Sequence, residues 1–189
     1  ENCTAEEGEE KYKLFTKTYK TLTKWWSSQH QLGRKKGYVT TGFGRVQPLP
    51  DIQSKIFSFQ SKDERKSVNG PVQGTSADIT KLAMGLIYAE VKKRGWEDRF
   101  KMILTVHDEI VFEIHKSILK EAVERVCHLM TRNQLIQKQN WAVPLLVDVE
   151  LGKDWTVPYD LKDIRIGKGH PELVEIFGGE KPLDKPSES

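Results

Sequence analysis

The sequence predicts an α+β fold, in which helices pack on a small antiparallel sheet. Two observations point to it: apolar residues recur at helical spacing in several segments, and β-prone stretches flank short polar bends. The composition, 37% hydrophobic and 30% charged in 189 residues, suits a globular protein with a real core. No apolar run approaches the roughly 20 residues of a membrane helix, and the acidic first ten residues are unlike a signal peptide. We therefore expect a cytoplasmic protein that is neither exported nor membrane-spanning.

The first expected element is a helix from Lys11 to about Gln31, which Gly33 can end. Its apolar side chains fall near one side: Leu14, Tyr19, Leu22, Trp25 and Trp26. Core packing of the tryptophans is favoured over stacking on bases. Every charged residue from Lys11 to Lys36 is basic, which suits nucleic acid and a solvated helix face equally well.

A hairpin is expected next, from Gly37 to Asp51, with Gly42 and Gly44 at its turn. The glycines and the proline between Asn69 and Thr75 predict a turn or loop there and exclude a continuous helix. Thr75 or Ser76 then caps a helix that Gly95 stops. Its buried stripe repeats at helical spacing: Ile79, Leu82, Ala83, Leu86, Ile87 and Val91.

The second half of the chain predicts the sheet. The arms Met102–Val106 and Ile110–Ile114 form a hairpin whose bend is His107-Asp108-Glu109. Ser117 caps a further amphipathic helix that runs to about Gln137, and Pro144–Leu151 is expected to add a strand to the hairpin. The helices would cover the far face of this sheet.

The chain from Tyr159 onward is rich in glycine and proline. We expect a tail at 159–189 that is mobile or docks a partner, with a short helical turn at Glu172–Phe177. The two cysteines, Cys3 and Cys127, lie too far apart in the sequence to suggest a disulfide framework or a zinc site.

The bend at His107-Asp108-Glu109 is the best candidate for chemistry. Adjacent carboxylates held by two strands present hard oxygen ligands to a divalent cation such as Mg²⁺. Acidic residues are also common at ordinary polar turns, and the pair alone favours that interpretation.

Three stretches favour the metal site over the ordinary turn. With these stretches in this order, the chain resembles the family-A DNA polymerases, the bacterial repair polymerases and their phage and mitochondrial relatives. Residues 37–51 resemble the family's GYxxTxxGRxxxLPD segment in the fingers subdomain. Residues 64–79 are similar to its ERxxxNxPxQGTxADI run, and Val106–Glu113 resembles its third palm motif. The resemblance covers about Lys11 to Trp155.

The resemblance implies a right-hand polymerase with an antiparallel palm sheet, packed helices and part of the helical fingers. Residues 1–66 would belong to the fingers, 67–158 to the palm and 159–189 to the tail. Asp108 would bind catalytic Mg²⁺, Glu109 would assist at or shape the metal site, and His107 would lie near the primer terminus. The implied DNA contacts are Arg65, Asn69 and Gln73 on the primer–template and Arg45 near the template. A surface cation at Arg65 and a turn-satisfying role for Asn69 are the structural alternatives.

Two motifs of the family are absent from this sequence: the DxSxxExR motif, which carries the second catalytic aspartate, and the RxxxKxxxFxxxYG helix, which grips the triphosphate. We therefore expect a fragment, cut or naturally split, whose N-terminal half is a second polypeptide. A phage source and the cytoplasm of a bacterium or infected host follow as expectations. Together the halves would add deoxynucleotides to a primer 3′ end on a DNA template, with two Mg²⁺ ions.

Two other functions stay open. A non-catalytic DNA-binding or scaffold module would keep the palm's shape while its acids have no role. A stand-alone metal-dependent phosphoesterase is less favoured, because no second carboxylate cluster of suitable spacing is present.

Overall fold

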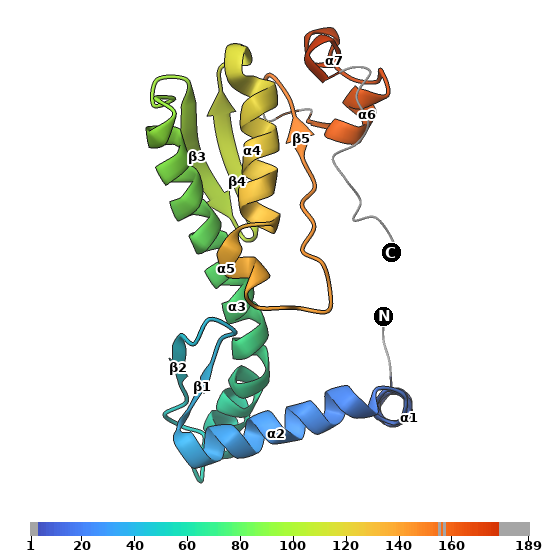
Figure 1. The fold of residues 1–189 in the computed structure, drawn as a ribbon. Helices are drawn as coiled ribbons and strands as arrows, with labels where there is room; N and C mark the ends of the chain where they lie inside the picture. Colours follow the sequence, from blue (N-terminus) through green and yellow to red (C-terminus); the bar gives the residue numbers. More distant parts are fainter. Residues whose placement is uncertain (1–3, 155, 157, 178–189) are drawn as a thin grey trace. The chain divides into compact units, whose positions relative to one another are not determined.

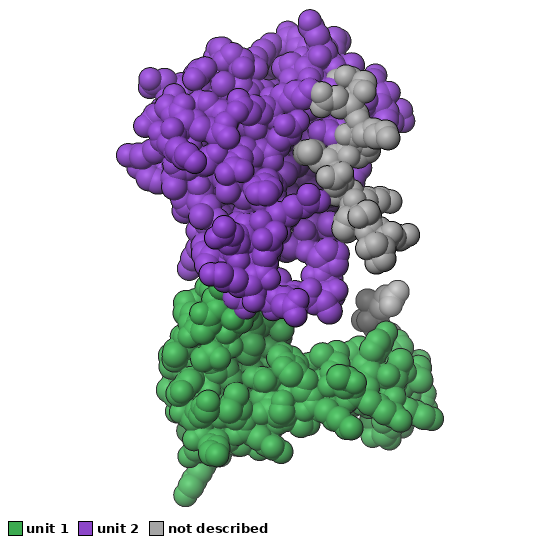
Figure 2. Space-filling model, viewed as in Figure 1, with its two compact units in different colours: residues 1–78 green, residues 79–189 purple. Residues whose placement is uncertain are grey.

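The structure is a computed structural model that describes residues 4–154, 156 and 158–177. The chain divides into two compact units, which we call unit 1 (residues 1–78) and unit 2 (residues 79–189), shown in Figure 2. Each unit combines helices with a short antiparallel hairpin (Figure 1), so the predicted α+β class is confirmed. No helix in the described part of the chain is long and apolar enough to cross a bilayer.

Unit 1 begins with two helices in place of the single one predicted. Helix α1 spans Ala5–Thr18 and α2 spans Lys20–Lys36. The chain turns at Tyr19, whose φ of −102° and ψ of 57° are not helical. A capping box between Thr4 and Glu7 starts α1 earlier than the apolar pattern indicates. Gly33 does not end α2, since the left-handed Gly37 does so, at φ 75°.

The apolar side of these two helices is not a core. Leu14 and Tyr19 are exposed by 66% and 54%, and the only buried residue of either helix is Gly33, within the described residues. Trp26 is half-buried and stacks on Phe15, with ring centroids 5.7 Å apart. Packing of this tryptophan is therefore partial, and most of the apolar side faces solvent.

The predicted glycine-rich hairpin is confirmed. Strand β1 (Tyr38–Thr40) pairs with β2 (Val46–Pro48), and Gly44 takes a left-handed φ of 83° between them. Val39 and Leu49 form a small core with Ile52. Gly33 of α2 approaches Leu49 so closely that an added Cβ would lie 2.9 Å from its Cδ1. The hairpin thus packs against α2 and lies beside the first half of α3 (Figure 1).

Helix α3 spans Phe57–Lys93 and is continuous through Pro71. The predicted turn at Asn69–Thr75 is therefore wrong, and so is a helix start at Thr75 or Ser76. A Cβ on Gly70 or Gly74 would lie 2.1 Å or 2.5 Å from the amide of Gln47, so these glycines let the hairpin approach the helix backbone. Contacts from distant sequence override the local preference for a turn.

The predicted bend at His107-Asp108-Glu109 lies in the hairpin of unit 2. Strand β3 (Phe100–Val106) pairs antiparallel with β4 (Glu109–Ile114) in the predicted positions. One face of the hairpin packs on the second half of α3 and on α4 (Leu119–Thr131). The shared core is apolar: Ala83, Ile87, Val91, Trp96, Phe100, Ile118, Ala122, Val126 and Leu129.

The helix predicted from Ser117 to Gln137 is three elements. A 3₁₀ turn, η1, covers Lys116–Ile118, then come α4 and α5 (Gln134–Gln137). His115 caps the turn in place of Ser117, because its ring accepts a bond from the Ser117 N–H. Asn133 interrupts the pattern because its side-chain oxygen accepts bonds from the N–H groups of Leu135 and Ile136.

The prediction that Pro144–Leu151 adds a third strand to the β3–β4 hairpin is wrong. Of Pro144–Leu151, only Glu150–Leu151 (β5) forms a strand, and it pairs with β6 (Tyr159–Asp160) rather than with the β3–β4 hairpin. Helices α6 (Leu161–Arg165) and α7 (Pro171–Phe177) follow. The short helix expected near the C-terminus is confirmed by α7.

The C-terminal segment also differs from a mobile tail as far as it is described. Leu161, Ile164, Leu173 and Phe177 are buried against Leu119 and Val123 of α4. Residues 159–177 therefore contribute apolar side chains to a core of unit 2. The remainder of the expected tail, 178–189, lies outside the described residues.

Candidate functional site

The bend between β3 and β4 is tighter than the predicted three-residue bend. Val106 pairs with Glu109, which leaves His107 and Asp108 as the two residues of the turn and makes Glu109 the first residue of β4. His107 has a φ of 55°, a left-handed conformation that few residues other than glycine adopt. A two-residue hairpin turn requires such a conformation at its first position, and histidine tolerates it better than most residues do.

The side chains of the bend are open to solvent. His107, Asp108 and Glu109 are all exposed. Among the described residues, the carboxylates of Asp108 and Glu109 have no ion-pair partner. Their oxygens are therefore available to a ligand, and the paired strands hold them in place.

The bend fits Mg²⁺ in donor type but not in donor number. Carboxylate oxygens are the protein ligands that Mg²⁺ prefers. In the described part of the chain, however, no three His, Cys, Asp or Glu side chains are grouped closely enough to hold a metal ion. If the bend holds Mg²⁺, further ligands have to come from outside the described residues.

A second group of predicted residues forms a stripe along α3 in unit 1. Arg65, Asn69 and Gln73 follow one another at intervals of four, so they lie on one face of the helix, and all are exposed. Arg65 donates from Nη1 to the Ser61 hydroxyl at 2.8 Å, which leaves the rest of its guanidinium available. Since Asn69 is inside a helix, the alternative in which it satisfies a turn before Pro71 is excluded.

The opposite face of α3 is buried under the chain that precedes it. Ser67 is fully buried, and the carboxylate of Asp63, only 1% exposed, accepts a bond from the Asp51 N–H at 2.7 Å. With Gly70 and Gly74, these residues form the contact with the β1–β2 hairpin and the loop after it. One helix therefore has a packed face and an exposed polar face.

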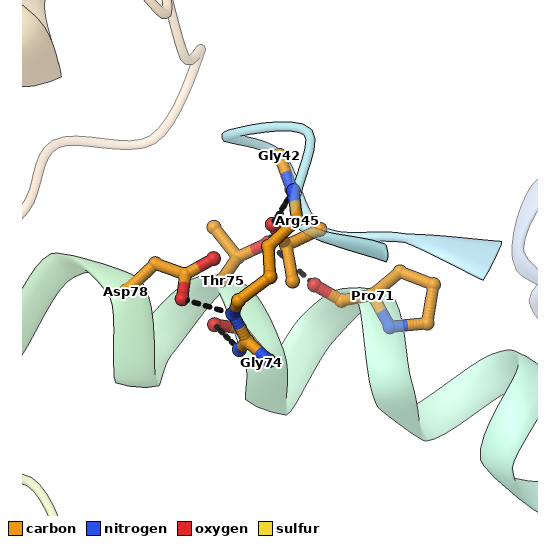
Figure 3. Close-up of polar contacts among 7 residues, drawn as sticks. Gly42, Arg45, Pro71, Gly74, Thr75 and Asp78 are labelled. Atoms are coloured by element: carbon orange, nitrogen blue, oxygen red, sulfur yellow. Dashed lines mark hydrogen bonds and ion pairs between the residues drawn. The ribbon is translucent and has the colours of Figure 1, made fainter. Parts of the chain in front are cut away.

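Arg45 lies between the hairpin and α3 (Figure 3). Its Nε donates to Asp78 Oδ1 at 2.6 Å, and its Nη2 donates to the Gly74 carbonyl at 3.1 Å. The side chain of Asp78 is 13% exposed and that of Arg45 is 44% exposed. Contact of Arg45 with a template stays a prediction, because this guanidinium already has two partners within the chain.

Two residues take part in this contact although the sequence did not predict that role for them. Thr75 accepts a hydrogen bond from the Gly42 N–H at 2.7 Å, and the Asp78 carboxylate accepts one from Arg45 Nε. Both lie in the 64–79 stretch used for the resemblance, but no local pattern indicates the contacts that they make. Their partners are 33 residues away in sequence.

Comparisons with known proteins find relatives that match most of this chain. A sequence model of DNA polymerase family A matches residues 1–157. The thermostable DNA polymerase I of Thermus aquaticus is 35% identical over 150 residues, which are 79% of this chain and 17% of that protein. DNA polymerase I of Geobacillus stearothermophilus is 35% identical over 161 residues, which are 85% of this chain and 17% of that protein.

A solved structure is similar as well. The POL domain of Pol1 from M. smegmatis, in complex with DNA primer-template and dNTP, matches with a TM-score of 0.64 and 28% identity. The match covers 69% of this chain and 23% of that one. The chain thus spans about one sixth of the length of the curated relatives that it matches. Because the family model matches most of its residues, this chain belongs to DNA polymerase family A.

Proposed function

We propose that this chain is the C-terminal part of a DNA-directed DNA polymerase that adds deoxynucleotides to the 3′ end of a primer on a DNA template. The observation that carries the proposal is the exposed bend, at which Asp108 and Glu109 project from a two-stranded hairpin in a chain of family A. The proposed chemistry is two-metal phosphoryl transfer, and this chain supplies one of the two catalytic aspartates.

Each residue of the bend has a proposed task. Asp108 is the metal ligand, Glu109 assists at that position or shapes it, and His107 lies near the primer terminus. In the reaction the primer 3′-hydroxyl attacks the α-phosphate of the incoming deoxynucleotide, a new phosphodiester bond forms, and pyrophosphate leaves. Two Mg²⁺ ions, when bound, would neutralise charge on the attacking and leaving oxygens.

The exposed stripe of α3 is the proposed contact with primer–template DNA. Arg65 can bind a phosphate, while the amides of Asn69 and Gln73 can donate and accept hydrogen bonds with base edges and sugars. Their spacing of four residues places the three side chains along about two turns of one helix. A protein–DNA contact needs such an exposed polar face on a rigid element.

A second polypeptide or chain segment is proposed to complete the site. The sequence has no DxSxxExR motif, and three or more potential metal ligands are nowhere grouped among the described residues. Ile103 and Leu104 of β3 are exposed by 58% and 41%, which suits a strand that a partner covers. The proposed partner brings the second aspartate and the helix that binds the triphosphate.

The test uses the complex that copurifies with the tagged chain from its native host. We expect that complex to extend a primer with Mg²⁺, and Asp108→Asn to lower the extension rate by at least about a hundredfold. Asp98→Asn is the matched control, since Asp98 is also an exposed acid, in the loop just before β3. Unchanged extension by the Asp108 variant would refute the proposed role of the bend.

The second candidate is a DNA-binding or scaffold module without catalysis. The observation that favours it is that the α3 stripe lies in unit 1, whereas the acids of the bend belong to unit 2. In that case the complex would bind a primer–template duplex, Arg65→Ala would weaken the binding, and Asp108→Asn would change neither binding nor any primer extension.

A further inference from the structure

The hydrogen bonds between the turn of the β1–β2 hairpin and α3 reach Gly74, Thr75 and Asp78. These residues lie in the two turns that follow Pro71, the residue expected to break this helix. A proline inside a helix has no N–H to donate to the carbonyl four residues earlier, and its ring pushes against that carbonyl. Helix α3 nevertheless runs through this position without interruption. The missing bond weakens the helix here, so contacts from outside the helix can stabilise it.

Contacts from the turn of the hairpin reach the helix just after Pro71 (Figure 3). The Thr75 hydroxyl donates to the Pro71 carbonyl at 2.5 Å and accepts from the Gly42 N–H at 2.7 Å. One turn further along, Arg45 joins the Gly74 carbonyl to the Asp78 carboxylate. Gly42 and Arg45 thus bind α3 at Gly74, Thr75 and Asp78, within about two turns of the helix after Pro71.

The exposed stripe lies on the other side of this same segment. Asn69 and Gln73 flank Pro71, and they stay one turn apart on one face only while the helix is unbroken between them. A kink at Pro71 would change the spacing and direction of both side chains. The geometry of the stripe therefore depends on the contacts behind it.

We infer that Arg45, through Asp78 and the Gly74 carbonyl, is a positioning residue that keeps α3 helical past Pro71 and so presents Asn69 and Gln73 to the DNA. The inference rests on the proposed function of the stripe. Arg45 acts through α3 and does not itself contact DNA. Its pairing with a largely buried carboxylate also offsets its charge, which makes it a poor contact for a phosphate.

The first experiment measures amide hydrogen exchange in the chain, without DNA. Arg45→Ala and Asp78→Ala should each speed exchange at residues 72–78 by on the order of threefold to tenfold, and the double variant should add little to either. Arg45→Lys should resemble Arg45→Ala, because an ammonium lacks the fork that reaches both partners. Lys20→Ala, which removes an exposed cation of α2, should leave these amides unchanged, and amides of residues 86–93 provide a reference for global unfolding.

The second experiment measures the salt dependence of binding to a primer–template duplex in the copurified complex. Arg65→Ala should lower the slope of log K against log salt by about 0.9, as expected for one lost phosphate contact. Arg45→Ala should weaken binding several-fold and leave this slope unchanged. Rescue of binding by Arg45→Lys, with the slope of the wild type, would identify Arg45 as a phosphate contact and overturn the inference.

The outcomes separate the inference from the proposed function. Exchange that is unchanged in the Arg45 and Asp78 variants refutes the positioning role, whatever the DNA result. If the variants exchange faster but the wild-type complex does not bind DNA, the proposed function of the stripe is refuted. The inferred role of the Arg45–Asp78 pair in DNA binding is then refuted as well. Faster exchange in the Arg45 and Asp78 variants, together with a wild-type salt slope for Arg45→Ala, supports both the inference and the proposed function.

Discussion

Glu90 joins two helices of unit 2 through a single buried carboxylate. Its Oε1 accepts from Arg94 Nε at 2.6 Å and from Arg125 Nε at 2.7 Å, so that α3 and α4 share it. The hydrogen bond from Arg94 is the main cause that lowers the pKa of Glu90 below 4.5, and Arg125 adds to it against the opposing effect of burial. The charged form is therefore the one that stabilises the fold.

We predict that Glu90→Gln lowers the free energy of unfolding by about 1–2 kcal/mol at neutral pH, because two charge-assisted bonds become weaker. Since the pKa of Glu90 is lower in the folded than in the unfolded chain, its contribution is complete above the unfolded value and is lost as the pH falls through the folded one. Urea unfolding at neutral and strongly acidic pH should show a difference between variant and wild type only at the neutral pH.

Glu121 is the matched control for this prediction. It also pairs with Arg94, but its side chain is 61% exposed. Glu121→Gln should cost less than about 1 kcal/mol, as exposed pairs do. An equal loss in the two variants, or a loss for Glu90→Gln that persists in acid, would contradict the role assigned to the buried carboxylate.

Two glycines of helix α3, Gly74 and Gly85, are expected to respond in opposite ways to substitution by alanine. A Cβ at Gly74 would lie 2.5 Å from Gln47 Nε2 and 2.6 Å from Thr41 Cγ2, whereas at exposed Gly85 it would meet no atom within 4 Å. The two residues belong to one continuous helix, so their intrinsic helix propensities are comparable. They differ in what packs against them.

We predict that Gly74→Ala destabilises the chain by about 1–3 kcal/mol, because the hairpin has to move away from the helix. Gly85→Ala should stabilise it by up to about 1 kcal/mol, the ordinary gain of alanine over glycine in a helix. Thermal unfolding followed by circular dichroism measures both. Stabilisation by Gly74→Ala would show that the hairpin does not pack on α3 as described.

At the scale of the whole chain, large apolar side chains remain at the surface. Tyr12 and Leu14 of α1 are exposed by 59% and 66%, and Ile103 of β3 by 58%. Both edges of the β3–β4 hairpin lack a third strand within the described residues. Exposed apolar patches and unpaired strands favour association with other chains.

We predict that the isolated chain self-associates and that the proposed partner suppresses this association. Light scattering after size-exclusion chromatography measures the effect, with the purified chain compared with the copurified complex at equal concentration. A monodisperse monomer that melts cooperatively on its own would contradict the need for a partner.

The sequence by itself determined the elements whose cause is local. Glycines at 42 and 44 set the turn of the first hairpin, and β-prone arms around His107 and Asp108 set the second, because turn chemistry and alternation act over a few residues. The order of three motifs also indicated family A, which the comparisons confirm. Asp108 and the Arg65–Asn69–Gln73 stripe are exposed, and the roles that the motifs imply for them stay predictions.

Only the tertiary structure decided the features that depend on distant contacts. Helix α3 continues through Pro71 with the β1–β2 hairpin bonded to the turns that follow, and β5 pairs with β6 instead of extending the sheet. The partners of Arg45 within the chain, Asp78 and the Gly74 carbonyl, likewise depend on distant sequence. Local propensity is worth less than the packing and hydrogen bonds that segments far apart in the sequence make, so these features could not be predicted from spacing alone.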